Sequence, residues 1–259
     1  MKMKKKSYLV SGAGSGIGRA MAIALAESSP SHGVILLGRT KSKLEETLSI
    51  LPRSSDHTIL AVDVQNTDAL RKAFQEINLG ERNLAAIIAN AGVGGANTYG
   101  ENDRWNEIIS TNLTGTYQLI QEALPALLRG TSEFKHIVIT SSILARIGVP
   151  GYSAYCASKA GLLGLMRSMA IEYAHRKILV NAICPGWVDT QMSQEGLEGI
   201  AHSSKMSIEA ALAEQMKMVP TRKMAQPSEV ANLLRYLVSD EQNSITGQCF
   251  DINNGALMP

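Results

Sequence analysis

Short aliphatic runs alternate with longer amphipathic segments from one end of the chain to the other. Continuous apolar runs of this length are typical of strands in a parallel sheet that is covered on both faces. The pattern predicts seven such strands, at residues 8–10, 34–37, 58–62, 84–89, 136–140, 179–183 and 249–252.

The segments between these runs have helical periodicity. Ile17, Ala20, Met21, Ala24 and Leu25 recur at the spacing of one helix face. Further helices are predicted at about residues 41–51, 67–79, 104–129, 153–175 and 228–238. Because no linker, charge block or repeat divides the chain, we expect one doubly wound α/β domain over residues 1–259, with a seven-stranded parallel sheet and helices on both faces.

The composition is that of an ordinary globular protein, with 45% hydrophobic and 19% charged residues. The formal charge of +2 depends on a basic tip made of Lys2, Lys4, Lys5 and Lys6, since the other 21 basic residues face 23 acidic ones. Nucleic-acid binding needs a basic patch on a folded face. We therefore expect a solvated basic tail and no nucleic-acid partner.

Membrane, disulfide and metal functions are not expected either. Serine and glycine interrupt the apolar run after Lys6, and no stretch reaches the roughly 18 apolar residues of a membrane span. Cys156, Cys184 and Cys249 lie far apart, and the five histidines are scattered. The sequence predicts a cytoplasmic protein without a disulfide framework, a metal site or a membrane partner.

A glycine-rich turn follows the first predicted strand, where parallel sheets bind ligands. Its spacing is G-x-x-x-G-x-G, and its backbone N–H groups and the following helix dipole suit a pyrophosphate. The alternative is a tight turn that needs positive φ. The candidate cofactor residues of the turn are Ser11, Gly12, Gly14, Ser15, Gly16, Ile17 and Gly18.

The end of the second strand indicates which nicotinamide cofactor is bound. Folds that choose NAD usually place an acid there, whereas this chain has Gly38 and Arg39. The guanidinium of Arg39 offers a permanently charged fork to a 2′-phosphate. We predict that NADP(H) is preferred over NAD(H); the alternative is a solvated arginine near a helix start.

Two further strand ends supply candidate cofactor contacts. Asp63, followed by Val64, can accept a hydrogen bond from the adenine amino group, or it can cap the next helix. Asn90, Ala91 and Gly92 let backbone pass close to the cofactor, or they form an ordinary turn.

Tyr155 and Lys159 are four residues apart within a predicted helix, so both side chains share one face. A tyrosine with its usual pKa of about 10 is a poor acid or base at neutral pH. An ammonium about 4 Å away could stabilise the phenolate by up to roughly 4 kcal/mol, about three pKa units. The alternative is that both are ordinary helix residues, but Ser142, 13 residues before Tyr155, and Asn112 favour a catalytic site.

The motifs together resemble the short-chain dehydrogenase/reductase superfamily, over essentially the whole chain. The resemblance implies a Rossmann fold that assembles into a homotetramer through its long fourth and fifth helices and final strand. The residues that carry the resemblance, besides the glycine turn, are Asn90, Ala91, Gly92, Asn112, Ser142, Tyr155, Lys159, Pro185 and Gly186.

The resemblance also implies a role for each residue of the site. Tyr155 is expected to be the general acid in reduction and the base in oxidation, while Lys159 lowers its pKa and both contact the nicotinamide ribose. Ser142 orients the carbonyl, and Asn112 seats a water for proton relay. The contacts expected to bracket the nicotinamide are Pro185, Gly186, Val188 and Thr190.

The substrate is less defined than the chemistry. Periodicity lapses at about residues 189–226, where the family has its substrate lid, and five of the 11 methionines fall there. They favour an uncharged or acyl-chain substrate, or they merely pack the lid. The chain resembles 3-oxoacyl-[acyl-carrier-protein] reductases of fatty acid biosynthesis, and also 3-hydroxybutyrate dehydrogenases.

Several alternatives stay open at this point. Arg129, Lys135, Arg176 and Lys177 could meet an acidic acyl carrier protein, although cations at helix ends are common. Sugar- and steroid-type alcohol dehydrogenases of the same superfamily are alternatives. An NADP-sensing binding module without turnover is another, but such a module has no need of the four tetrad residues.

Overall fold

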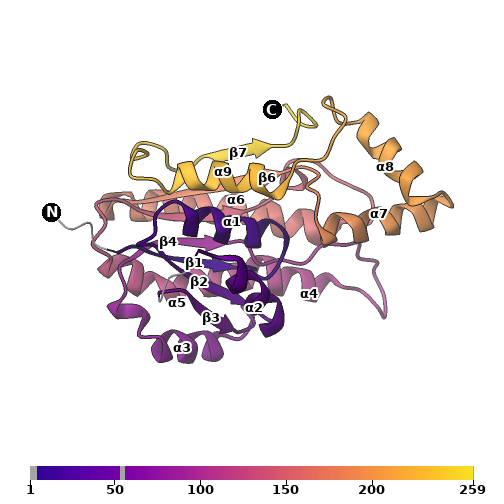
Figure 1. Cartoon of the computed structure of the whole chain (residues 1–259). Helices are drawn as coiled ribbons and strands as arrows, with labels where there is room; N and C mark the ends of the chain where they lie inside the picture. The colour runs from indigo at the N-terminus through magenta and orange to yellow at the C-terminus, as the bar shows by residue number, and fades with distance from the viewer. Residues whose placement is uncertain (1–4, 53–55, 259) are drawn as a thin grey trace.

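The computed structural model describes residues 5–52 and 56–258. Seven strands form its sheet, namely β1 (Ser7–Ser11), β2 (Gly33–Gly38), β3 (Thr58–Ala61), β4 (Leu84–Ala89), β5 (Lys135–Thr140), β6 (Ile178–Pro185) and β7 (Cys249–Ile252). Their order is β3-β2-β1-β4-β5-β6-β7, and all neighbours are parallel (Figure 1). The predicted seven-stranded Rossmann sheet is confirmed.

Helices connect the strands and cover both faces of the sheet (Figure 1). They are α1 (Gly16–Glu27), α2 (Lys41–Ile50), α3 (Thr67–Glu76), α4 (Trp105–Ile109), α5 (Gly115–Arg129), α6 (Ser153–Tyr173), α7 (Gln191–Ser204), α8 (Ile208–Lys217) and α9 (Pro227–Leu237). Short 3-10 helices lie at Leu79–Glu81, Ile143–Ala145 and Ala174–Arg176.

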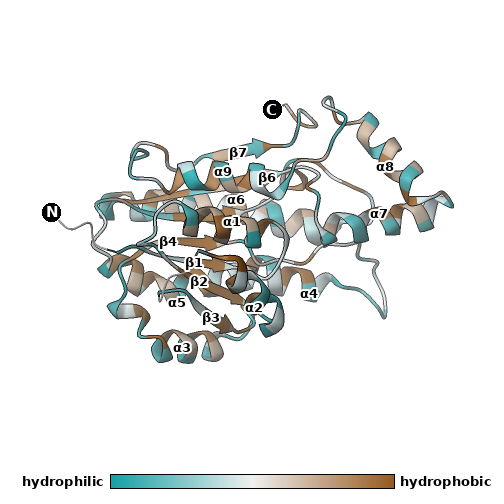
Figure 2. Ribbon diagram, viewed as in Figure 1, coloured by the Kyte–Doolittle hydropathy of each residue, from teal (hydrophilic) through white to brown (hydrophobic). Residues whose placement is uncertain are grey.

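The sheet separates two hydrophobic cores. Val10 of β1 packs with Leu25 of α1 and Leu234 of α9 on one face, and α2 joins them. Leu9, the neighbour of Val10, points to the other face and joins Leu119 of α5, together with α3 and α6. Figure 2 shows the central strands β1, β2 and β4 in the brown of hydrophobic residues. Burial on both faces explains why these strands are continuous apolar runs.

The strand order reverses beside β1, which pairs with β2 on one side and β4 on the other. Connections from the two neighbouring carboxyl ends then run to opposite faces and leave a crevice at this edge. The glycine turn after β1 and the Asn90 segment after β4 meet at this point. The fold therefore places the predicted cofactor residues together.

Two predicted elements differ from the structure. The helix expected over residues 104–129 is interrupted by a π-helical segment, Ser110–Thr114, between α4 and α5. Residues 189–226, expected to be irregular, contain the helices α7 and α8. Only Leu197 and Ala201 are buried on α7. Because so few positions are buried, the periodicity of this region is weak.

The basic tip is not a free tail where the structure describes it. Lys5 pairs with Asp56 at 2.8 Å, and Lys6 pairs with Asp240. Lys2 and Lys4 lie outside the described residues. In the described part of the chain, every helix is too short or too polar to cross a membrane.

Candidate active site

The glycine turn has the backbone that its sequence predicts. Gly12 and Gly16 have positive φ values of 67° and 52°. A Cβ atom on Gly18 would lie 2.1 Å from the carbonyl oxygen of Gly12, so only glycine allows α1 to approach β1 this closely. Exposed Ser15 precedes α1 and makes no side-chain cap. The first N–H groups of α1 therefore lack a side-chain cap from Ser15 and suit an anion.

Gly14 differs from the other glycines of the turn. A Cβ atom there would lie 3.0 Å from the Cβ of Lys43, the third residue of α2. Gly14 therefore also allows close packing of the glycine turn against α2. Its contact with the cofactor stays a prediction.

Ser11 is a link between strands rather than an exposed contact. Its side chain is buried, and Oγ accepts hydrogen bonds from the N–H groups of Asn90 (2.9 Å) and Ala91 (3.0 Å). The Asn90 amide returns a bond to the Ser11 carbonyl at 3.2 Å. The Ser11 hydroxyl fixes the Asn90–Ala91 backbone against β1, and a contact of Ser11 with the cofactor stays a prediction.

Arg39 and Asp63 lie next to each other at the ends of β2 and β3. Arg39 Nη1 is 4.0 Å from Asp63 Oδ2, and 57% of the Arg39 side chain is exposed. Asp63 does not cap α3, because Asn66 makes that bond to the Ala69 N–H at 2.9 Å. The alternative reading of Asp63 as a helix cap is thus excluded. The Arg39 guanidinium is largely free for a phosphate.

Val64 and Gly115 pack closely behind this region. A Cβ atom on Gly115 would lie 2.7 Å from Cγ2 of Val64, whose side chain is buried. Any contact of Val64 with a cofactor must therefore come from its backbone.

Tyr155 and Ser142 meet at the carboxyl edge of the sheet. Ser142 follows β5, and Tyr155 lies in the first turn of α6. The Ser142 hydroxyl lies close enough to the Tyr155 hydroxyl to lower the pKa of Tyr155 as a hydrogen-bonding group. Ser142 Oγ also accepts the N–H of Leu144 at 3.1 Å, which fixes the serine. Two hydroxyls so placed can share one carbonyl oxygen.

Burial acts on the ionisation of both helix residues. It raises the pKa of Tyr155 to about 12, and the bond from Ser142 opposes this change. Burial also lowers the pKa of Lys159 to about 8. Desolvation disfavours the charged form of each group. The lowering of the tyrosine pKa by Lys159 stays a prediction.

The backbone at the end of β5 binds the ammonium group of Lys159. Its Nζ donates a hydrogen bond to the carbonyl oxygen of Thr140 at 2.9 Å and lies 5.6 Å from the centre of the Tyr155 ring. A Cβ atom on Gly92 would lie 3.6 Å from Nζ. The ammonium thus lies directly beside the backbone of Gly92 and is buried.

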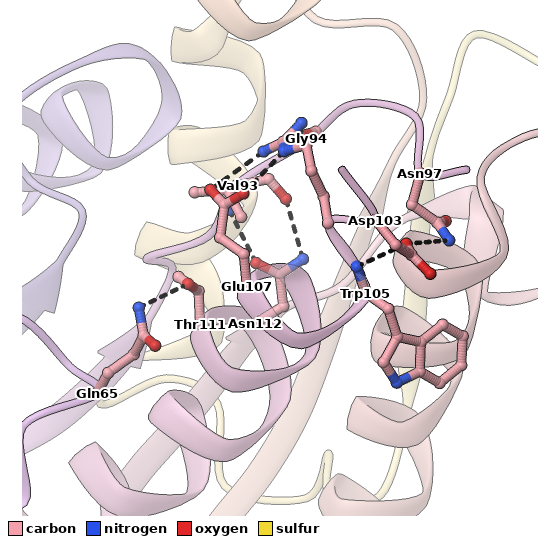
Figure 3. A network of polar contacts seen from close by, with 10 residues as sticks. Gln65, Val93, Gly94, Asn97, Asp103, Trp105, Glu107, Thr111 and Asn112 are labelled. Atoms are coloured by element: carbon pink, nitrogen blue, oxygen red, sulfur yellow. Dashed lines mark hydrogen bonds and ion pairs between the residues drawn. The ribbon is translucent and has the colours of Figure 1, made fainter. Parts of the chain in front are cut away.

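Asn112 belongs to the π-helical segment and is fully buried. Its Oδ1 accepts the Val93 N–H at 2.8 Å, and its Nδ2 donates to the Val93 carbonyl at 3.0 Å (Figure 3). Nδ2 also donates to Ser158 Oγ at 3.1 Å. These bonds occupy the amide. The side chain thus holds the segment after β4 against α6, and the role of Asn112 in seating a water for proton relay stays a prediction.

The loop after β6 approaches the glycine turn. A Cβ atom on Gly16 would lie 3.2 Å from Cγ2 of Thr190, which caps α7 through the N–H of Ser193. Thr190 Oγ1 also donates to the Val188 carbonyl at 3.3 Å, and the Val188 side chain is buried. Pro185 ends β6, and Gly186 N–H donates to Ile252. Backbone from this loop and Thr190 therefore face α1.

The predicted carrier-binding residues do not line this site within one protomer. Arg129 ends α5, Lys135 begins β5, and Arg176 and Lys177 precede β6. All four thus lie at the amino edge of the sheet, opposite Ser142.

Two polar residues beside the site were not predicted from the sequence. Arg104 donates to the Gly94 carbonyl at 3.0 Å and binds Glu107 through two bonds (Figure 3). Asn97 contacts the start of α6. Both lie around a loop without periodicity, where only spatial contacts reveal them.

Comparisons with known proteins agree with this geometry. The family model described as enoyl-(acyl carrier protein) reductase matches residues 12–256. The 3-oxoacyl-[acyl-carrier-protein] reductase FabG of Staphylococcus aureus is 34% identical over 262 residues, covering all of both chains. The chain belongs to the short-chain dehydrogenase/reductase family. As a member of this family it is an oxidoreductase that acts on a carbonyl or CH–OH group.

Solved structures of the family have the same fold. Actinorhodin polyketide ketoreductase with NADPH superimposes with a TM-score of 0.89 at 27% identity, covering 97% of each chain. The ligand-free aldohexose dehydrogenase of Thermoplasma acidophilum has a TM-score of 0.83 at 29% identity and covers 98% of this chain and 94% of that chain. The family's members thus include both ketone reductases and sugar dehydrogenases.

Proposed function

We propose that this short-chain dehydrogenase/reductase uses NADPH to reduce the ketone of 3-oxoacyl thioesters in the cytoplasm. The observation that carries the proposal is the contact between the Ser142 and Tyr155 hydroxyls, with Lys159 one turn further along α6. This group lies at the same edge of the sheet as the glycine turn. A carbonyl oxygen and a nicotinamide can therefore meet there.

Each residue has a role in the proposed reaction. The bound cofactor supplies a hydride to the carbonyl carbon. Tyr155 donates its phenolic proton to the carbonyl oxygen, so the C=O bond becomes CH–OH and a phenolate remains on Tyr155. A pKa of about 12 keeps the phenol protonated before the step. Ser142 hydrogen-bonds the same oxygen, and the Lys159 ammonium stabilises the phenolate.

The residues around the crevice fit a nicotinamide dinucleotide. The first N–H groups of α1 suit the pyrophosphate. Gly12 and Gly18 lack side chains and so allow the glycine turn and α1 to pack closely, which brings these N–H groups to the crevice. Lys159 and Tyr155 suit the nicotinamide ribose. Arg39 suits a 2′-phosphate, and the neighbouring Gly38 adds no carboxylate that would repel it. The NADPH in the related polyketide ketoreductase supports this choice.

The thioester is favoured by similarity and by the lid. The relative FabG acts, by its name, on 3-oxoacyl groups carried by an acyl carrier protein. In α7, Met192 lies against the loop after β4: a Cβ atom on Gly94 would be 3.1 Å from its sulfur. This flexible apolar side chain borders the entrance and suits an acyl chain. We propose that residues 189–226 form the lid.

The consumption or formation of NADPH with a panel of substrates tests the substrate class. The panel contains acetoacetyl-CoA, the same acyl group on an acyl carrier protein, free acetoacetate, crotonyl-CoA and an aldohexose with NADP. We expect turnover of the acetoacetyl thioesters above all others. Preference for crotonyl-CoA, the free acid or the sugar would contradict the proposal. The KM for the carrier-bound thioester is compared with the KM for acetoacetyl-CoA. A lower KM for the carrier-bound form in the wild type, with no such difference in Arg176→Glu, would support a carrier surface at the amino edge.

We also propose a homotetramer. Large apolar side chains are exposed on the helices predicted to form the interface: Trp105 on α4, Tyr117 on α5 and Ile171 on α6, the last at 83% exposure. Light scattering after size exclusion should give four times the chain mass of 27.8 kDa. A monomer at micromolar concentration would contradict this.

A further inference from the structure

Asn97 lies in the loop between β4 and α4 and turns inwards, between exposed Ala96 and Thr98. Its Oδ1 accepts hydrogen bonds from the N–H of Ala154 at 2.9 Å and from Ser153 Oγ at 3.2 Å. Both partners belong to the first turn of α6. Asn97 therefore caps this helix from a segment more than fifty residues away in sequence.

The residues directly before α6 supply no side-chain cap for it. Tyr152, which precedes the helix, makes no side-chain cap, and residues 146–151 before it are exposed. Asn97 N–H also donates to the Gly151 carbonyl at 2.7 Å, so this one residue holds both sides of the helix start. Tyr155 is the third residue of α6. Its position depends on how firmly this first turn is held.

The amide of Asn97 extends the same connection to α4. Its Nδ2 donates to Asp103 Oδ1 at 3.2 Å, and that oxygen accepts the Trp105 N–H at 2.9 Å (Figure 3). Trp105 begins α4, which continues into the π-helical segment that holds Asn112. Asn97 thus joins the starts of the two helices that carry Asn112, Tyr155 and Lys159.

We propose that Asn97 is a positioning residue for Tyr155. By fixing the first turn of α6 to the loop after β4, it holds the Tyr155 hydroxyl beside Ser142 at the distance that proton transfer requires. The proposal rests on the proposed function, because it gives Asn97 a part in the proton transfer from Tyr155. Asn97 itself touches neither cofactor nor substrate in this role.

Asn97→Ala tests the proposal in the full-length enzyme. We expect kcat with acetoacetyl-CoA to fall about tenfold, which corresponds to the loss of one part-buried helix cap. The solvent deuterium isotope effect on kcat should rise because proton transfer becomes slower, whereas the KM for NADPH should stay within about twofold. Amide exchange at residues 154–156 should become faster than in the wild type.

A reciprocal exchange provides the rescue. Asn97→Asp together with Asp103→Asn keeps the two bonds that position 97 accepts from α6 and reverses donor and acceptor between positions 97 and 103. The exchange loses the Trp105 N–H bond, because one oxygen of Asp103 accepts both bonds. Compared with Asn97→Ala, kcat and the isotope effect should therefore return part of the way to the wild-type values. Asn66→Ala is the matched control, since Asn66 makes an equivalent 2.9 Å cap on α3; it should leave the isotope effect unchanged. If Asn97→Ala does not fold, Asn97→Gln, which displaces the amide by one methylene, is measured in the same way.

The outcomes separate this proposal from the proposed function. Unchanged kcat and unchanged amide exchange in Asn97→Ala would overturn the positioning role, as would an equal rise of the isotope effect in Asn66→Ala. If the wild type reduces no carbonyl compound, the proposed function fails. Amide exchange would then still show whether Asn97 fixes the first turn of α6.

Discussion

At the scale of single residues, the chemistry depends on how burial changes two neighbouring groups. The pKa of Tyr155 is raised to about 12 and that of Lys159 is lowered to about 8, in both cases by desolvation. A protonated phenol and a protonated ammonium coexist below pH 8. This combination suits reduction, in which the tyrosine gives up its proton beside a positive charge.

The charge of Lys159 leads to a pH prediction. Because its pKa is about 8, the ammonium is present below pH 8 and is lost as the pH rises through this value. We expect kcat/KM for reduction to fall about tenfold per pH unit above pH 8. Lys159→Arg should be slower but without this descending limb up to pH 9, because arginine stays charged. A descending limb in both proteins would contradict the assignment.

Cofactor choice is also decided by single residues. In Gly38→Asp, a carboxylate next to Arg39 repels a 2′-phosphate and accepts hydrogen bonds from ribose hydroxyls. We expect the ratio of kcat/KM for NADPH over NADH to fall about tenfold or more, since 1.4 kcal/mol is a factor of ten. Gly38→Asn is the control, because it makes the same 3.3 Å Cβ contact with Leu44 without the charge. An equal ratio in both variants would refute the electrostatic explanation.

At the scale of elements, the strands were predictable and the connections much less so. β4 and β5 are buried at every position, so their aliphatic runs indicate strands without ambiguity. The π-helical segment lies inside a continuous helical pattern, and no residue type in it predicts a change from α- to π-helix. α7 and α8 were missed because most of their residues are exposed, which weakens the periodicity of 3.6 residues.

The candidate site shows the same division. Tyr155, Lys159 and Ser142 were predictable because their spacing places them on one helix and one strand end. The support behind them was not. Asn97 and Asn112 act through contacts with backbone that is distant in sequence. Such contacts depend on the packing of elements, which spacing along the chain does not specify.

The link between β1 and β4 can be tested at this scale. Ser11→Ala removes the acceptor of two N–H groups, those of Asn90 and Ala91, and buried donors without partners are costly. We expect the free energy of unfolding in urea to fall by about 1–3 kcal/mol. Ser11→Thr retains the hydroxyl and should lose much less. Equal stability of the two variants would show that this link is unimportant.

At the scale of the whole molecule, a buried histidine at the amino edge of the sheet makes stability depend on pH. Burial lowers the pKa of His136 to about 4, and its Nδ1 has no hydrogen-bond partner among the described residues. The unfolded chain binds this proton below about pH 6.5. The native state binds this proton only near pH 4. The contribution of His136 to the free energy of unfolding is therefore fully present above about pH 6.5 and is lost as the pH falls.

The size of this effect is measurable by urea unfolding between pH 7 and pH 4. We expect the wild type to lose about 3 kcal/mol over this range through His136. His136→Leu should flatten the dependence, while His175→Gln, a change at an exposed histidine, should not. The same slope in His136→Leu as in the wild type would contradict the assignment.

The central claim is that the molecule reduces a carbonyl group with a proton from Tyr155. The most direct test is the rate of NADPH oxidation with acetoacetyl-CoA by the wild type and by Tyr155→Phe, in samples whose NADPH binding is verified by fluorescence. We expect Tyr155→Phe to lose at least about a thousandfold in kcat while it still binds NADPH. Full activity of this variant would contradict the account, and so would the absence of turnover in both proteins despite tight binding, which is the behaviour of a cofactor-sensing module.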